Sequence, residues 1–149
     1  MFLSLLTQAQ NNKQNTEKEF LTQLNNILIN SKEQHWKYTG AMTIDTAFAI
    51  NKAGVLSATV RYTNEDGSFL ITRIEAPVNK ILRVAYDLYL ILEYKDDEVT
   101  VYESEPEKNE LVPLNKSNLF HIGVPQKDGY AQKEKLQKLL DKLLKYYKN

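Results

Sequence analysis

The segment Ile44–Arg73, IDTAFAINKAGVLSATVRYTNEDGSFLITR, contains the same short pattern twice, an Asn followed three residues later by a Gly. The two stretches, Asn51–Gly54 and Asn64–Gly67, separate runs in which apolar and polar residues alternate, as in strands with one buried face. An Asn and a Gly at this spacing are typical of a type I turn in which the Gly has a positive φ and forms a G1 bulge. The segment therefore predicts a three-stranded antiparallel meander.

The turn geometry also predicts which residues of the meander face each other. In the first hairpin it places Ile50 opposite Leu56 on the apolar face and Asp45 opposite Arg61 on the polar face. The second hairpin follows the same geometry, with three predicted pairs: Tyr62 with Leu70, Ala58 with Ile74 and Thr59 with Arg73. Because apolar residues meet apolar residues and the charges are opposite, the pairing supports the turn assignment.

Further strands are predicted after the meander. The run ILRVAYDLYLILEYK, residues 81–95, alternates over a length that exceeds one strand, so a break is expected near Asp87. The segments VTVYES (99–104) and LFHIGV (119–124) are also typical of strands, whereas the charged, proline-containing stretch Glu103–Asn118 is predicted to be an exposed loop. With a first strand that starts at Tyr38, the sequence predicts about six or seven antiparallel strands.

A helix is predicted on each side of these strands. In the N-terminal helix, Thr16–Lys32, Thr16 and Glu19 match a capping box. The C-terminal run Tyr130–Tyr147 has one leucine stripe and many lysines, with Asp128 as its cap, and is expected to cover the apolar face of the sheet. The alternative for this helix is a membrane surface or the groove of a partner. The predicted fold class is α+β, with residues 16–149 as a single domain.

An antiparallel meander followed by one amphipathic helix resembles the PH-like barrels. The stretch EAPVNKILRVAYD, residues 75–87, is similar to their proline-containing corner, and the C-terminal helix is similar to the helix that plugs the barrel. The resemblance covers Tyr38–Tyr147 and implies a half-barrel that binds lipid headgroups, peptides or protein partners rather than a catalyst. The loop that would hold phosphates in such a barrel is Asn51–Gly54, whose single lysine does not favour phosphoinositide binding.

The composition argues against several classes of function. Nineteen basic and nineteen acidic residues cancel, so no strong field attracts nucleic acid, and the absence of cysteine excludes disulfides and thiolate metal sites. The two histidines, His35 and His121, lie far apart and lack a metal-ligand spacing. The chain also has no nucleophile elbow, P-loop or dinucleotide motif. We therefore predict a non-catalytic protein without a metal or cofactor.

Residues 1–15 form a separate N-terminal segment in this prediction. MFLSLLTQAQ has a short apolar run, Phe2–Leu6, followed by a small-x-small pattern, but it lacks a basic n-region and a long apolar region. The segment is either the remnant of a truncated export signal, which implies a periplasmic or secreted protein, or an apolar tail of a cytoplasmic one. No apolar run is long enough to span a bilayer.

The candidate binding residues are Arg61, Arg73, Arg83 and Tyr89. All three arginines of the chain lie on predicted strands, and their guanidinium groups can bind a carboxylate or phosphate through two hydrogen bonds. Tyr89 alternates onto the same face as Arg83, and Tyr and Arg are typical anchors at interfaces. The sequence thus predicts a contact surface for a protein, peptide or small ligand, and the alternative is a cross-strand ladder of ion pairs. A second predicted function is a carrier that holds a small apolar ligand between the sheet and the C-terminal helix.

Overall fold

The computed structural model describes residues 2–31, 41–125 and 127–148. It contains helices α1 (Phe2–Asn30) and α2 (Gly129–Leu144) and a short 3-10 turn, η2 (Val78–Lys80). The strands are β1 (Ala41–Ile50), β2 (Val55–Thr63), β3 (Phe69–Pro77), β4 (Ile81–Asp87), β5 (Tyr89–Tyr94), β6 (Val99–Ser104), β7 (Leu111–Ser117) and β8 (Leu119–Gly123). The predicted start of the first strand at Tyr38 lies outside the described residues.

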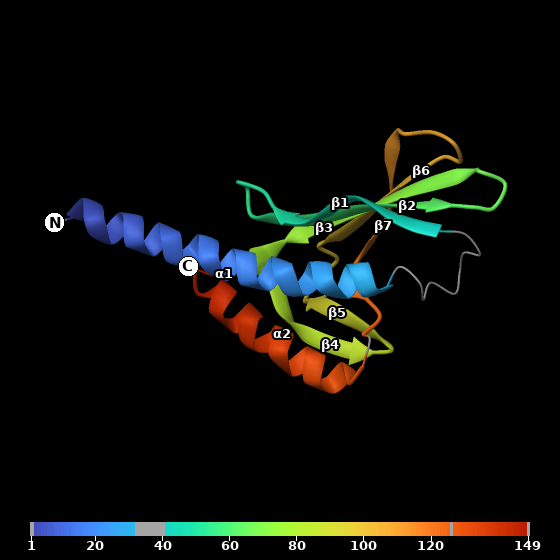
Figure 1. The fold of residues 1–149 in the computed structure, drawn as a ribbon. Helices are drawn as coiled ribbons and strands as arrows, with labels where there is room; N and C mark the ends of the chain where they lie inside the picture. The colour runs from blue at the N-terminus through green and yellow to red at the C-terminus, as the bar shows by residue number, and fades with distance from the viewer. Residues whose placement is uncertain (1, 32–40, 126, 149) are drawn as a thin grey trace.

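The strands form two antiparallel sheets. The larger sheet has the order β1-β2-β3-β6-β7, and the smaller has the order β4-β5-β8. Helix α2 packs on β4 and on α1, which also contacts β1 and β8 (Figure 1). The α+β class is therefore confirmed, with eight strands among the described residues in place of six or seven, and the sheets do not close into a barrel.

The two Asn-x-x-Gly turns have the predicted geometry. Gly54 and Gly67 have φ values of +76° and +86°, and the backbone N–H of each donates to the carbonyl of the Asn that opens its turn. All three pairs predicted for the second hairpin are observed, as is the pair of Ile50 with Leu56 in the first. The local chemistry of the turns thus sets the register of β2 against β3 along its whole length.

The register of β1 against β2 departs from the prediction beyond the pairs nearest the turn. Two irregularities, one between Ile44 and Thr46 and one between Thr46 and Ala49, shift β1 so that Thr43 lies opposite Arg61. The predicted pairing with Asp45 is therefore wrong, because each bulge inserts an extra residue into one strand. Asp45 still forms an ion pair with Arg61, at 3.0 Å from Nη2 to Oδ2. The long guanidinium side chain reaches the displaced carboxylate.

The stretch predicted as an exposed loop, Glu103–Asn118, contains a strand. Strand β7 pairs with β6 at the edge of the larger sheet, and its central residues are exposed. The prediction was wrong because an edge strand with two exposed faces lacks the alternating apolar pattern, and because Pro113 is tolerated at an edge. The predicted break near Asp87 is confirmed, since Leu88 separates β4 from β5 with φ +62°.

Helix α1 begins at Phe2, well before the predicted start at Thr16. The Thr16 hydroxyl donates to the carbonyl of Asn12 at 2.9 Å, as it does inside a helix, so the predicted capping box is wrong. Figure 1 shows that the N-terminal half of α1 extends beyond both sheets. An apolar stripe buries its C-terminal half: Phe20, Leu24, Ile27 and Leu28.

Helix α2 follows its prediction closely. The carboxylate of Asp128 accepts from the backbone N–H groups of Tyr130 and Ala131, which caps the helix. The leucine stripe of the helix faces the core through four buried residues, Leu136, Leu140, Leu143 and Leu144. Helix α2 therefore covers the smaller of two sheets, whereas the prediction had a single sheet for it to cover.

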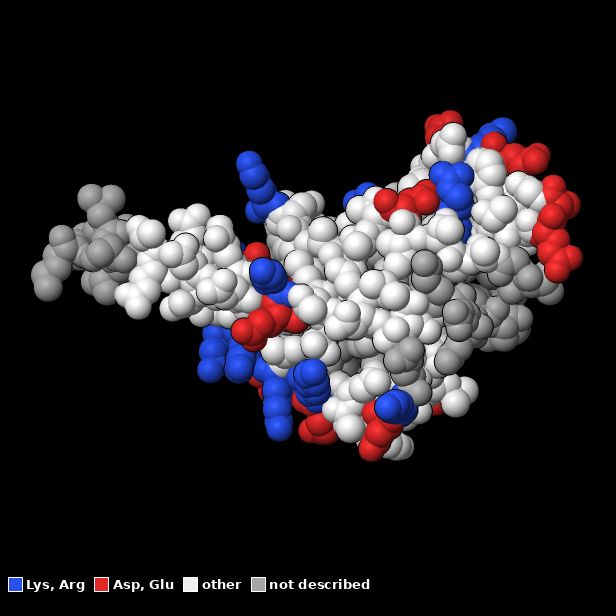
Figure 2. All heavy atoms as spheres, in the orientation of Figure 1, with Lys and Arg blue, Asp and Glu red and all other residues white. Residues whose placement is uncertain are grey.

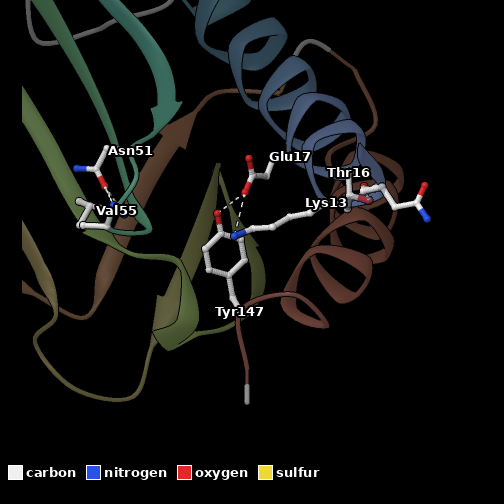
Figure 3. A network of polar contacts seen from close by, with 8 residues as sticks. Lys13, Thr16, Glu17, Asn51, Val55 and Tyr147 are labelled. Carbon is white, nitrogen blue, oxygen red and sulfur yellow. Dashed lines mark hydrogen bonds and ion pairs between the residues drawn. The ribbon is translucent and has the colours of Figure 1, made fainter. Parts of the chain in front are cut away.

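Tyr147 joins the C-terminus to α1 and to the first turn of the meander (Figure 3). Its hydroxyl donates to Glu17, and the Nζ of Lys13 lies 4.4 Å from the centre of its ring. A Cβ on Gly54 would lie 3.2 Å from the same ring, so the turn and the ring are in close contact. Burial, together with the bond to Glu17, raises the pKa of Tyr147, which keeps its hydroxyl protonated as a donor.

Candidate functional site

Arg61 and Arg73 lie on the outer face of the larger sheet, each beside a carboxylate. The Arg61 guanidinium pairs with Asp45 and lies 4.5 Å from the centre of the Phe69 ring. The Nε of Arg73 is 3.1 Å from Glu75, whose other oxygen accepts from the hydroxyl of Tyr102 at 2.9 Å. These contacts form part of the predicted ladder of ion pairs, and partly exposed pairs of this kind stabilise a sheet only slightly.

Arg83 and Tyr89 belong to the smaller sheet, so the structure does not bring the four candidate residues together. Arg83 pairs with Glu93 across β4 and β5 and is largely exposed. Tyr89 lies on the same face, as predicted, but its side chain lines a pocket between the two sheets. A contact surface that includes all four residues stays a prediction.

The pocket that Tyr89 lines has a volume of about 240 Å³. Its walls are the inner face of the larger sheet, the C-terminal end of α1 and the strand β8. Most of the lining is apolar, and its buried apolar residues are Leu28, Met42, Phe48, Ala58 and Ile122. On the sheet the lining continues through residues that are only half-buried, Val60, Tyr62, Thr72, Ile74 and Val101.

Asn25 of α1 holds the wall of the pocket that β1 provides. Its side-chain amide accepts from the backbone N–H of Phe48 at 2.7 Å and donates to the carbonyl of Phe48 at 3.1 Å. Phe48 lies within the second irregularity of β1, between Thr46 and Ala49. The amide thus satisfies backbone groups that the bulge removes from the strand ladder, and it directs the Phe48 ring toward the pocket and Phe120.

Ser31 connects the end of α1 to the chain after β8. Its hydroxyl oxygen lies 2.7 Å from the carbonyl of Ile27 and accepts from the backbone N–H of Val124 at 2.8 Å. A Cβ on Gly123 would overlap this hydroxyl and would lie 3.2 Å from Ile27 Cγ2. Gly123 therefore permits the close approach of α1 and β8 that forms one end of the pocket.

His121 and Tyr89 form the aromatic part of the lining. Their rings are 5.8 Å apart and nearly perpendicular, at 79°, an arrangement that favours an edge-to-face contact. Although part of His121 is exposed, desolvation lowers the pKa of its imidazole below the ordinary value. The histidine is therefore mainly neutral at pH 7, and the lining residues that the structure describes carry no charge at that pH.

We expect the protein to lose stability on mild acidification through His121. Because the pKa of His121 is lower in the folded chain than the ordinary value of 6.5, the unfolded chain binds the proton first as the pH falls. The free energy of unfolding should thus be highest above pH 6.5 and decrease below it. Urea unfolding at pH 7.5 and 5.5 measures this difference, which should be smaller in His121→Gln. An equal pH dependence in both proteins would contradict the expectation.

The face of the molecule in Figure 2 carries charged side chains in several places. Lysines and acidic residues lie together beside the helices, and further acidic residues lie at the far end of the larger sheet. Within residues 2–31, 41–125 and 127–148, no group of His, Asp and Glu side chains is placed to hold a metal ion. The first histidine, His35, lies outside these ranges. In the same ranges neither helix is long and apolar enough to cross a membrane.

Comparisons with known proteins add no relative. The chain matches no protein-family model, no curated protein and no solved structure.

The pocket does not lie where the sequence predicts a ligand. The predicted place is between the sheet and the C-terminal helix, but the described lining contains no residue of α2. The sequence does indicate the apolar inner face of the meander, which another element has to cover. What could not be derived is that β4, β5 and β8 form a sheet of their own and that α2 covers that sheet.

Proposed function

We propose that the protein is a non-catalytic carrier or sensor of a small, largely apolar molecule, which it holds in the pocket between the two sheets. The observation that supports this function is the pocket of about 240 Å³ with its mostly apolar lining. Protein interiors are usually packed without voids of this size, and an apolar cavity of about 150 Å³ already admits benzene. A pocket with apolar walls and a few polar groups is the usual form of a ligand site.

A contact surface around the arginines is the second candidate function. Arg83 is the residue that favours it, because its side chain remains largely exposed although it pairs with Glu93. Arg61 and Arg73 favour it less, since their carboxylate partners lie on the same sheet face. Replacing both with Ala should lower thermal stability slightly and leave ligand binding in the pocket unchanged.

Titration of the protein with 1-octanol tests the proposed function. The molecule has an apolar chain and one hydroxyl, so it represents the simplest ligand of the proposed class. Isothermal titration calorimetry should give one site per chain with a dissociation constant below about 1 mM, which is roughly 4 kcal/mol of binding free energy. A native mass spectrum of the protein as purified should also contain a bound small molecule. No heat of binding together with a ligand-free mass would exclude a carrier of this kind.

A further inference from the structure

The charge of the ligand can be inferred from the pocket, provided that the proposed function holds. Among the lining residues of the described chain there is no Lys, Arg, Asp or Glu. Among these described residues, the imidazole of His121 is the only lining group that titrates near neutral pH. A charged group that entered this lining would lose its hydration without gaining an opposite charge, which is unfavourable.

Three described charged residues of the larger sheet, Glu103, Arg61 and Arg73, lie outside the lining. Glu103 on β6 lies opposite Thr72, so its side chain is on the same sheet face as the pocket. Its carboxylate would repel an anionic ligand. Arg61 and Arg73 lie on the outer face of that sheet and pair with carboxylates there. A carboxylate or phosphate in the pocket would thus meet one negative charge and no described positive one.

The lining nevertheless contains polar atoms. Thr72 contributes a hydroxyl group from the larger sheet, and His121 contributes an imidazole from the smaller one. The hydroxyl of Ser31 is already engaged with Ile27 and Val124. Groups of this kind suit a ligand that has an uncharged polar group, such as a hydroxyl or carbonyl, on an apolar body.

We propose that the pocket selects uncharged amphipathic molecules against ions with the same apolar body. A matched series of ligands separates charge from size: 1-octanol, octanoate and octylammonium, all titrated calorimetrically at pH 7.5. The chain length is constant, so a difference in affinity reports the head group. We expect 1-octanol to bind at least about 10-fold more tightly than either ion, which corresponds to about 1.4 kcal/mol or more.

The outcomes of this series test the inference and the proposed function separately. If octanoate or octylammonium binds as tightly as 1-octanol, the inference is wrong and the carrier function stands. If none of the three binds, the carrier function itself fails. Glu103→Gln serves as the control for the cation, because an octylammonium affinity that depends on Glu103 would show that this carboxylate belongs to the site and would overturn the inference.

A charge introduced into the lining should reverse the selection. Val60 is half-buried and lines the pocket on β2, so Val60→Lys places an ammonium group where the chain has none. Octanoate should then gain at least about 10-fold in affinity relative to 1-octanol. An unchanged ratio of the two affinities in the folded variant would contradict the inference. If the variant does not fold, the series of three ligands on the native chain tests the inference without it.

Discussion

Gly123→Ala destabilises the protein by about 1–3 kcal/mol, although the same substitution in an ordinary strand is stabilising. The added methyl group overlaps the Ser31 hydroxyl and presses on Ile27, and both residues are buried at the end of α1. Ser31 has to move, which weakens its bond from the N–H of Val124. The loss should be visible as a lower midpoint in urea unfolding followed by circular dichroism.

A double-mutant cycle separates this contact from a general effect on β8. In the background Ser31→Gly, the hydroxyl and its Cβ are absent, so Gly123→Ala should cost less than it does in the native chain. If the cost is the same in both backgrounds, or if Gly123→Ala raises stability, α1 and β8 do not approach each other as the structure has them.

Ala58→Phe abolishes the binding of 1-octanol or weakens it at least about 10-fold, equivalent to about 1.4 kcal/mol. Ala58 is 4% exposed and lines the pocket on β2, so a larger side chain at this position can extend only into the pocket. The phenyl ring would then occupy the space that the ligand needs. Calorimetric titration of the folded variant measures the loss.

The matched control for Ala58→Phe is Thr43→Phe. Thr43 is exposed on β1, so the control adds the same ring to the same sheet outside the pocket. It should bind 1-octanol like the native chain. Thermal unfolding of Ala58→Phe adds a second test, because a ring that fills empty space should not lower the midpoint, whereas overpacking costs about 1–3 kcal/mol. Unchanged binding by Ala58→Phe would mean that the ligand lies elsewhere.

Features of the fold that depend on local chemistry were predictable from the sequence. Gly54 and Gly67 take positive φ because each follows an Asn at the spacing of a type I turn, and the register of β2 against β3 follows from that alone. The cap of α2 by Asp128 is equally local. The break at Leu88 could be expected because the alternating run was too long for one strand.

Features that depend on distant contacts were not predictable. The second bulge of β1 is satisfied by Asn25, a residue on another element, and nothing in the sequence near Phe48 indicates it. Strand β7 shows no alternation of apolar and polar residues because both of its faces are exposed. Its pairing with β6 leaves no pattern in its own sequence. The candidate site was missed for the same reason. The apolar face of the meander was evident from the sequence. The elements that cover it, α1 and β8, are brought to it only by the packing of the folded chain.

The central claim, that a small apolar ligand lies between the two sheets, is tested most directly by nuclear Overhauser effects between bound 1-octanol and the protein. We predict contacts from the octyl chain to the methyl groups of Ala58, Val60 and Ile122, which line the pocket on β2 and β8. Contacts confined to α2, or to the outer sheet face around Arg61 and Arg73, would contradict the claim.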